Sequence, residues 1–196
     1  MKILRIIQNI IIGISLFVLS ILPLLVAFGD DYIKLESTLY KVSFISVFLV
    51  MLIRPLADIF RSQKWLRKLV YLRKGFGILS ASIIVGFVIG HIISPESQYI
   101  ASMFTKEYWS LDSYMLFAHI GDITALILLI TSNNLSMMLL KQNWKRIQKL
   151  AYVYFYTGGI YEALALESEF AIVAMIIITL VTIIAFVINI KKYEKN

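Results

Sequence analysis

Six long apolar stretches constrain this chain more than any other feature of its sequence. They cover residues 6–28, 39–56, 75–93, 113–140, 150–166 and 170–190. A helix that crosses the hydrocarbon core of a bilayer needs about 20 mostly apolar residues. Some stretches are rich in Ile and Val, but a backbone in lipid must satisfy its own hydrogen bonds, so each is expected to be helical. The sequence therefore predicts an all-α integral membrane protein, a six-transmembrane-helix bundle formed by one domain of residues 1–196.

The composition favours a membrane protein and excludes several other classes. Hydrophobic residues make up 60% of the chain, charged residues only 16%, and the mean hydropathy is +0.83. Soluble domains are closer to half apolar and a quarter charged. A soluble core formed by 196 residues cannot bury all of these additional apolar side chains. The absence of cysteine excludes thiolate metal sites, thiol nucleophiles and iron–sulfur clusters. The Walker, G-x-S-x-G and H-E-x-x-H motifs are also missing.

The net charge of +7 is explained by where the charges lie. Of the 19 basic residues, 16 lie at the N-terminus, between stretches two and three, between stretches four and five, or at the C-terminus. The other connections carry most of the acids: Asp30, Asp31, Glu36, Glu96, Glu107, Asp112, Glu167 and Glu169. By the positive-inside rule, this alternation predicts a multi-pass protein of the inner (plasma) membrane with both termini cytoplasmic. Nucleic acid is not an expected partner, because no segment is soluble enough to form a basic groove.

Few ionisable side chains fall inside the apolar stretches. They are His91, His119, Asp122 and Glu162, and the two histidines are the only ones in the chain. At 1.5 Å per residue, all four are expected in the outer half of the membrane. Because His119 and Asp122 are three residues apart, they share a helix face, and the carboxylate is placed to hold the imidazole N–H.

Three interpretations of this set remain open. In the first, His91 and His119 are the two axial ligands of one b-type heme. In the second, all four side chains bind a metal ion such as zinc, or relay protons. The third interpretation is structural, with the polar groups forming hydrogen bonds that hold neighbouring helices together.

Four further features of the sequence carry structural expectations. Gly86 and Gly90 form a small-residue face that admits either a close helix or the flat face of a porphyrin. The basic stretch 61–74 has the mixed composition of an amphipathic helix at the lipid interface. The aromatic-rich outer loop 94–112 is expected to fold back onto the membrane surface. Gly158 and Gly159 are expected to soften or kink the fifth helix.

The order of several short segments resembles the ferric-reductase-like transmembrane domain family. These segments are LIRPLA at 52–57, RKGFG at 73–77, ITS at 130–132, Trp144, and IQKLAY at 147–152. The resemblance covers residues 39–166 and is nearest to the heme-binding membrane subunit of the bacterial periplasmic methionine sulfoxide reductase system. It implies a six-helix protein that carries electrons across the membrane on b-type heme, held by histidines between the third and fifth helices.

Most of the heme-ligand histidines of that family are missing here. The family's histidine in the third helix falls on Phe87, and His91 lies one helical turn further out. The family pattern Trp-x-x-x-His ends at Gln148, and the later histidine of the fifth helix corresponds to Tyr161. The resemblance thus implies one heme b whose iron is held by His91 with His119 or Tyr161. Asp122 and Glu162 would border that pocket.

The resulting expectation is a membrane subunit that passes electrons to an extracytoplasmic redox partner. Since the chain has no flavin or nicotinamide domain, the electron donor would be quinol in the bilayer. Such a protein is at most the electron-transfer subunit of an oxidoreductase system. The alternatives are a heme-free structural or assembly protein of the same fold, and a metal or proton site in the outer leaflet. Oligomeric state is left open.

Overall fold

The computed structural model of the protein describes residues 2–29, 32–95, 97–110 and 114–193. These residues form helices and connecting turns, with no strand among them. The charged residues Asp30, Asp31, Glu96, Asp112 and Lys195 lie outside the described residues. The predicted all-α class is therefore confirmed for the described part of the chain.

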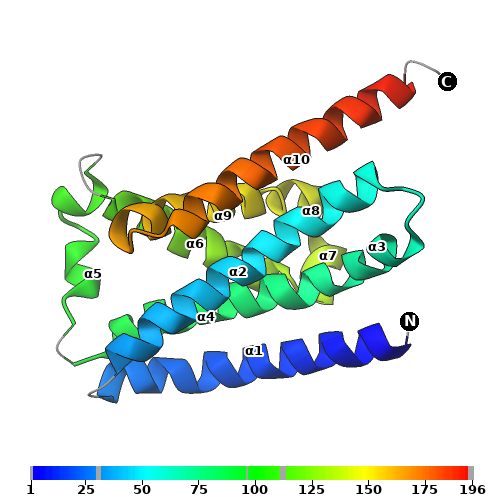
Figure 1. The fold of residues 1–196 in the computed structure, drawn as a ribbon. Coiled ribbons are helices and arrows are strands. Elements are labelled where there is room, and N and C mark those ends of the chain that lie inside the picture. The colour runs from blue at the N-terminus through cyan, green and yellow to red at the C-terminus, as the bar shows by residue number, and fades with distance from the viewer. Residues whose placement is uncertain (1, 30–31, 96, 111–113, 194–196) are drawn as a thin grey trace.

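Six helices form the body of the molecule (Figure 1). They are α1 (Lys2–Phe28), α2 (Tyr32–Ile59), α4 (Arg73–Ile93), α6 (Met115–Thr131), α9 (Leu150–Ala165) and α10 (Glu169–Tyr193). Four segments are long and apolar enough to cross a membrane alone: Lys2–Phe28, Leu35–Ile59, Lys64–Ile93 and Glu169–Ile190. A fifth candidate is α6 together with α7 (Asn134–Leu140), whereas α9 has only 16 residues. Four or five membrane-length segments are thus present, and the sixth span stays a prediction.

The stretch predicted as one span over residues 113–140 is divided into two helices among the described residues, and its crossing as one span stays a prediction. Helix α6 ends at Thr131, and α7 leaves it at an angle of 92°. Polar groups cause this break. The Asn133 side chain accepts a hydrogen bond from the Ser136 N–H at 2.7 Å, which caps α7. The Trp144 indole N–H donates to the Thr131 carbonyl at 2.9 Å.

The short helices gather at the two ends of the bundle. Figure 1 shows α3 (Lys64–Leu69), α7 and α8 (Gln142–Ile147) at the end where α1 begins and α10 finishes. We name this the basic end, because most of the basic residues lie there. The opposite end, named the acidic end, holds α5 (Tyr99–Ser102) and η2 (Glu107–Trp109).

The short helices pack apolar side chains onto the bundle. Leu66 on α3 and Leu72 on η1 (Val70–Leu72) are buried, while Trp65 is exposed. Tyr108 of the outer loop is also buried, so this loop packs onto the bundle. The predicted positions of both segments at the lipid interface stay predictions.

Helix α4 lies at the centre of the bundle, in contact with α1, α2 and α6. Its small-residue face receives α1: a Cβ on Gly86 would lie 3.0 Å from the Leu22 side chain, and one on Gly90 would lie 2.5 Å from Val26 Cβ. A close helix, and not a porphyrin, thus occupies this face. Helix α9 is one uninterrupted helix through Gly158 and Gly159.

Candidate functional site

A cluster of polar and aromatic side chains surrounds His119 at the acidic end of α6. The His119 side chain is buried, with the residue 8% exposed, and its ring stacks on Tyr108 with the centroids 3.4 Å apart. Its Nδ1 atom lies 3.9 Å from Asp122 Oδ2 and has no hydrogen-bond partner among the described residues. The predicted shared face is confirmed, but the expected hydrogen bond is not formed, because 3.9 Å exceeds hydrogen-bond distance.

The outer loop supplies the hydrogen bond that Asp122 accepts. Tyr99 Oη donates to Asp122 Oδ2 at 3.2 Å. The Tyr99 ring also stacks on His91, with 6.0 Å between centroids, and meets Tyr108 edge to face at 6.3 Å. Two loop tyrosines therefore connect the two histidines in one row of ring contacts. These tyrosines are not among the site residues predicted from the sequence, where the only signal for them is the aromatic content of the loop.

Both loop tyrosines are held in their protonated form. Burial, followed by the nearby charge of Asp122, raises the pKa of the Tyr99 hydroxyl well above its ordinary value. Burial also raises the pKa of the Tyr108 hydroxyl, and Asp122 adds to that rise. A neutral phenol keeps its proton available for donation. Tyr99 is therefore a stable hydrogen-bond donor to the carboxylate.

A cavity of about 70 Å³ adjoins this cluster through Asp122. It has room for a few water molecules. Helices α2, α6 and α9 form most of its walls, and α4 contributes Ile84. Its polar lining consists of Tyr40, Ser43, Asp122, Tyr154, Tyr161 and Glu162. Glu162 is only 4% exposed, and its Oε1 atom has no hydrogen-bond partner among the described residues. The cavity therefore joins the buried Glu162 carboxyl group to the partly exposed Asp122 carboxyl group of another helix.

A triad of hydroxyl groups continues the polar region towards the middle of the bundle. Tyr154 Oη lies 2.7 Å from Ser80 Oγ and 3.1 Å from Ser43 Oγ, and the two serine oxygens are 2.9 Å apart. These residues come from α9, α4 and α2, so the triad ties three helices together. Tyr154 and Ser43 also line the cavity.

The described side chains do not fit a heme at the positions that the family resemblance suggests. Phe87 is 1% exposed and stacks on Tyr40 at 4.8 Å, and Tyr40 lies 6.1 Å from the ring of Tyr161. Side chains of α2 thus fill the region between α4 and α9. Cofactor pockets commonly enclose about 300–1,000 Å³, whereas this cavity measures about 70 Å³ and neither histidine lines it.

The other predicted ligand arrangements also differ from what the structure shows. Gln148, at the family's histidine position, donates from Nε2 to Thr131 Oγ1 at 3.3 Å, near the basic end. Within the part of the chain that the structure describes, no three His, Asp or Glu side chains converge as metal ligands. His91 and His119 are connected by tyrosine rings, while Glu162 lines the cavity, which neither histidine does.

In the part of the chain that the structure describes, the protein is all-helical. Several of its helices are long and apolar enough to cross a membrane, and a polar site lies at its acidic end. Comparison with family models, with curated proteins and with solved structures finds no match for the chain. The function must therefore be argued from the site itself.

Proposed function

We propose that this protein is a six-span membrane protein with cytoplasmic termini whose outer-leaflet site exchanges protons with the extracytoplasmic side. The basic residues cluster at the end that holds both the start of α1 and the finish of α10. The proton site consists of His119, Asp122 and Glu162. Ionisable groups at membrane depth are costly to bury and commonly mark proton or ion pathways.

One observation carries this proposal: the His119–Asp122 pair opens onto a cavity that also holds the Glu162 carboxyl group. The imidazole Nδ1 and a Glu162 oxygen are both buried without partners among the described residues. An ordered water satisfies such atoms, and unpaired buried polar atoms are also typical of functional sites. Histidine is also the side chain whose ordinary titration spans physiological pH.

The chemistry of this arrangement is a short relay. His119 and Asp122 share a proton across their 3.9 Å gap through small side-chain movements or one water. Tyr99 stabilises the negative charge on Asp122 by donating its hydrogen bond. Water in the cavity then links Asp122 to Glu162. A zinc site would need at least three ligands that converge on one point. No such group occurs among the described side chains, so proton exchange is better supported than metal binding.

The experiment is a proton-exchange measurement on the purified protein in lipid nanodiscs. Proton uptake after a pH jump, followed with an indicator dye, should fall by about one proton per chain in Glu162→Gln and in Asp122→Asn. The control is Glu169→Gln, which removes an exposed carboxyl group at the same end. Equal uptake in all three variants and the parent would contradict the proposal and favour a structural role.

Electron transfer through heme stays a prediction of the resemblance, and one spectrum tests it. Protein purified from heme-replete cells is expected to show no Soret band, and no α band after dithionite reduction, because the described cavity is too small for a porphyrin. A clear α band that disappears in His119→Ala would restore the heme interpretation and contradict the heme-free arrangement.

A further inference from the structure

A second hollow lies at the basic end, far from the proton site. It is formed where α2 ends and where α3 and η1 return towards the bundle. Its volume is about 350 Å³, within the range of small-ligand sites. The residues that line it are Arg54, Ala57, Asp58, Arg61, Arg67 and Val70. This basic hollow plays no part in the proposed proton exchange.

Three guanidinium groups face one carboxylate in the basic hollow. Arg54 Nε donates to Asp58 Oδ2 at 3.1 Å, so this pair is partly neutralised. Arg67 has no carboxylate partner among the described residues. The site thus carries an excess of positive charge. Arginine is well suited to bind phosphate, because its planar fork of N–H donors matches two phosphate oxygens.

The fold holds one of these arginines in position. Arg61 Nε donates to the Asp58 carbonyl at 3.0 Å, and an Arg61 Nη group donates to the Asn189 side-chain oxygen on α10. These bonds use Nε and one Nη group, and no bond to a described residue uses the other Nη group. Because Arg61 is fixed before a ligand arrives, less side-chain entropy is lost when the ligand binds.

The surroundings of the basic hollow match the interface of a bilayer. Phe60, Trp65 and Tyr71, from the same segment, are 51%, 58% and 38% exposed. Aromatic side chains favour the head-group level of a membrane. Phe186 and Ile190 flank Asn189 on α10 and are also exposed, which gives acyl chains an apolar surface beside the cations. Water-soluble phosphate would gain nothing from this surface.

From this arrangement we propose that the basic hollow is a binding site for the phosphate group of an anionic phospholipid. Arg61 and Arg67 bind the phosphate oxygens, and the exposed face of α10 receives an acyl chain. The neighbouring Asp58 positions Arg54 and Arg61 and disfavours a second anion. The site is distinct from a diffuse attraction between basic loops and anionic lipid, because it depends on particular arginines.

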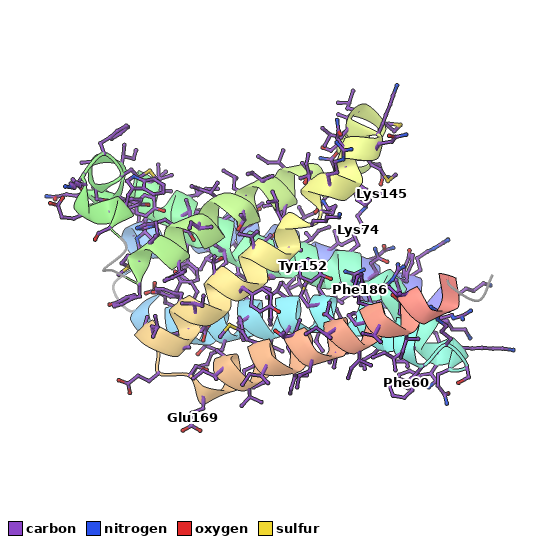
Figure 2. The ribbon with its side chains drawn as sticks, turned by 90° about the horizontal axis from the view of Figure 1, so that it is seen from above. Phe60, Lys74, Lys145, Tyr152, Glu169 and Phe186 are labelled. Atoms are coloured by element: carbon purple, nitrogen blue, oxygen red, sulfur yellow. The ribbon has the colours of Figure 1, made fainter. Side chains whose placement is uncertain are left out.

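The test compares two double variants that remove the same charge from the same end. Arg61→Gln with Arg67→Gln alters the basic hollow. Lys145→Gln with Arg146→Gln alters α8, and Figure 2 shows Lys145 and Phe60 at opposite edges of the basic end. Native mass spectrometry of the full chain would measure retention of phosphatidylglycerol, with phosphatidylcholine as the neutral lipid. A further variant, Arg61→Lys with Arg67→Lys, keeps the charge and the fold but removes the fork geometry.

The expected result is at least a tenfold weaker retention of phosphatidylglycerol, roughly the loss of one charge-assisted hydrogen bond, in the glutamine variant of the hollow. The lysine variant should show a smaller loss, and the α8 variant should bind as the parent does. Equal losses in both glutamine variants would overturn the proposal, since only the general charge would matter. Thermal stabilisation by inorganic phosphate alone, without retained lipid, would also overturn the assignment to a phospholipid.

Discussion

At the scale of single residues, the site depends on a few polar groups, of which His119 and Glu162 are buried and Asp122 is partly exposed. His119 and Asp122 come from one helix, and their three-residue spacing already placed them on one face. The hydrogen bond to Asp122, however, comes from Tyr99, which is 23 residues away in the chain. Local spacing therefore predicts half of this cluster, while the docking of the outer loop supplies the other half.

The protonated loop tyrosines make the fold sensitive to alkaline pH. In the folded protein the pKa of the Tyr99 hydroxyl is raised above its ordinary value of about 10. The folded state therefore binds this proton more tightly than the unfolded state, so the stabilisation is fully present below about pH 10 and is lost as the pH rises further. We expect the melting temperature in detergent to fall steeply above that pH. The fall should be shallower in Tyr99→Phe, and an identical slope would show that this phenol stays exposed to solvent.

At the scale of helices, close packing of small residues decides which elements meet. Gly86 and Gly90 bring α4 against Leu22 and Val26 of α1. From the sequence this face suited a helix and a porphyrin equally. The spacing of the two glycines does not indicate which helix or cofactor packs against them. The structure identifies that element as α1.

Gly90 provides the test of that packing. A methyl group on Gly90 would lie 2.5 Å from Val26 Cβ and 3.1 Å from the Pro23 carbonyl oxygen, so α1 must move away. We expect Gly90→Ala to lower the free energy of unfolding by about 1–3 kcal/mol, measured by thermal denaturation in detergent. The matched control is Gly77→Ala on the same helix, where the nearest atom is 3.9 Å away. The control should be neutral or stabilising, because Ala favours helices over Gly. Equal effects of the two changes would contradict close α1–α4 packing.

At the scale of the whole molecule, the number of membrane crossings depends on α9. This helix has 16 residues, which at 1.5 Å per residue span about 24 Å of a core that is about 30 Å thick. Its neighbours α8 and α10 begin at opposite ends of the bundle in Figure 1. The bundle geometry thus supports a crossing by α9, although its length alone falls short.

Cysteine labelling can count these crossings, because the natural chain has no cysteine. Lys145 lies on α8 at the basic end, and Glu169 opens α10 at the acidic end (Figure 2). With six spans, Glu169→Cys should react with an impermeant maleimide on intact cells. Lys145→Cys should react only after the membrane is permeabilised. Labelling of both positions under the same condition would mean that α9 does not cross.

The sequence by itself determined the helical class, the membrane-length apolar segments, the separation of basic and acidic connections, and the region where the ionisable groups lie. Hydropathy and charge determine these properties, and both can be read from neighbouring residues. The same hydropathy criterion extended one predicted span through residues 131–134, because it averages over a whole stretch. It does not detect the polar side chains there that end α6 and cap α7.

Only the tertiary structure decided what occupies the interior. Tyr40 fills the region between Phe87 and Tyr161, and Tyr108 covers the His119 ring. Each contact joins residues that are distant in the chain, and the fit depends on the volumes and directions of several side chains at once. The positions of His91 and His119 in the sequence therefore suggested them as heme-ligating residues. The space available to a cofactor, however, depends on how the helices and the outer loop pack.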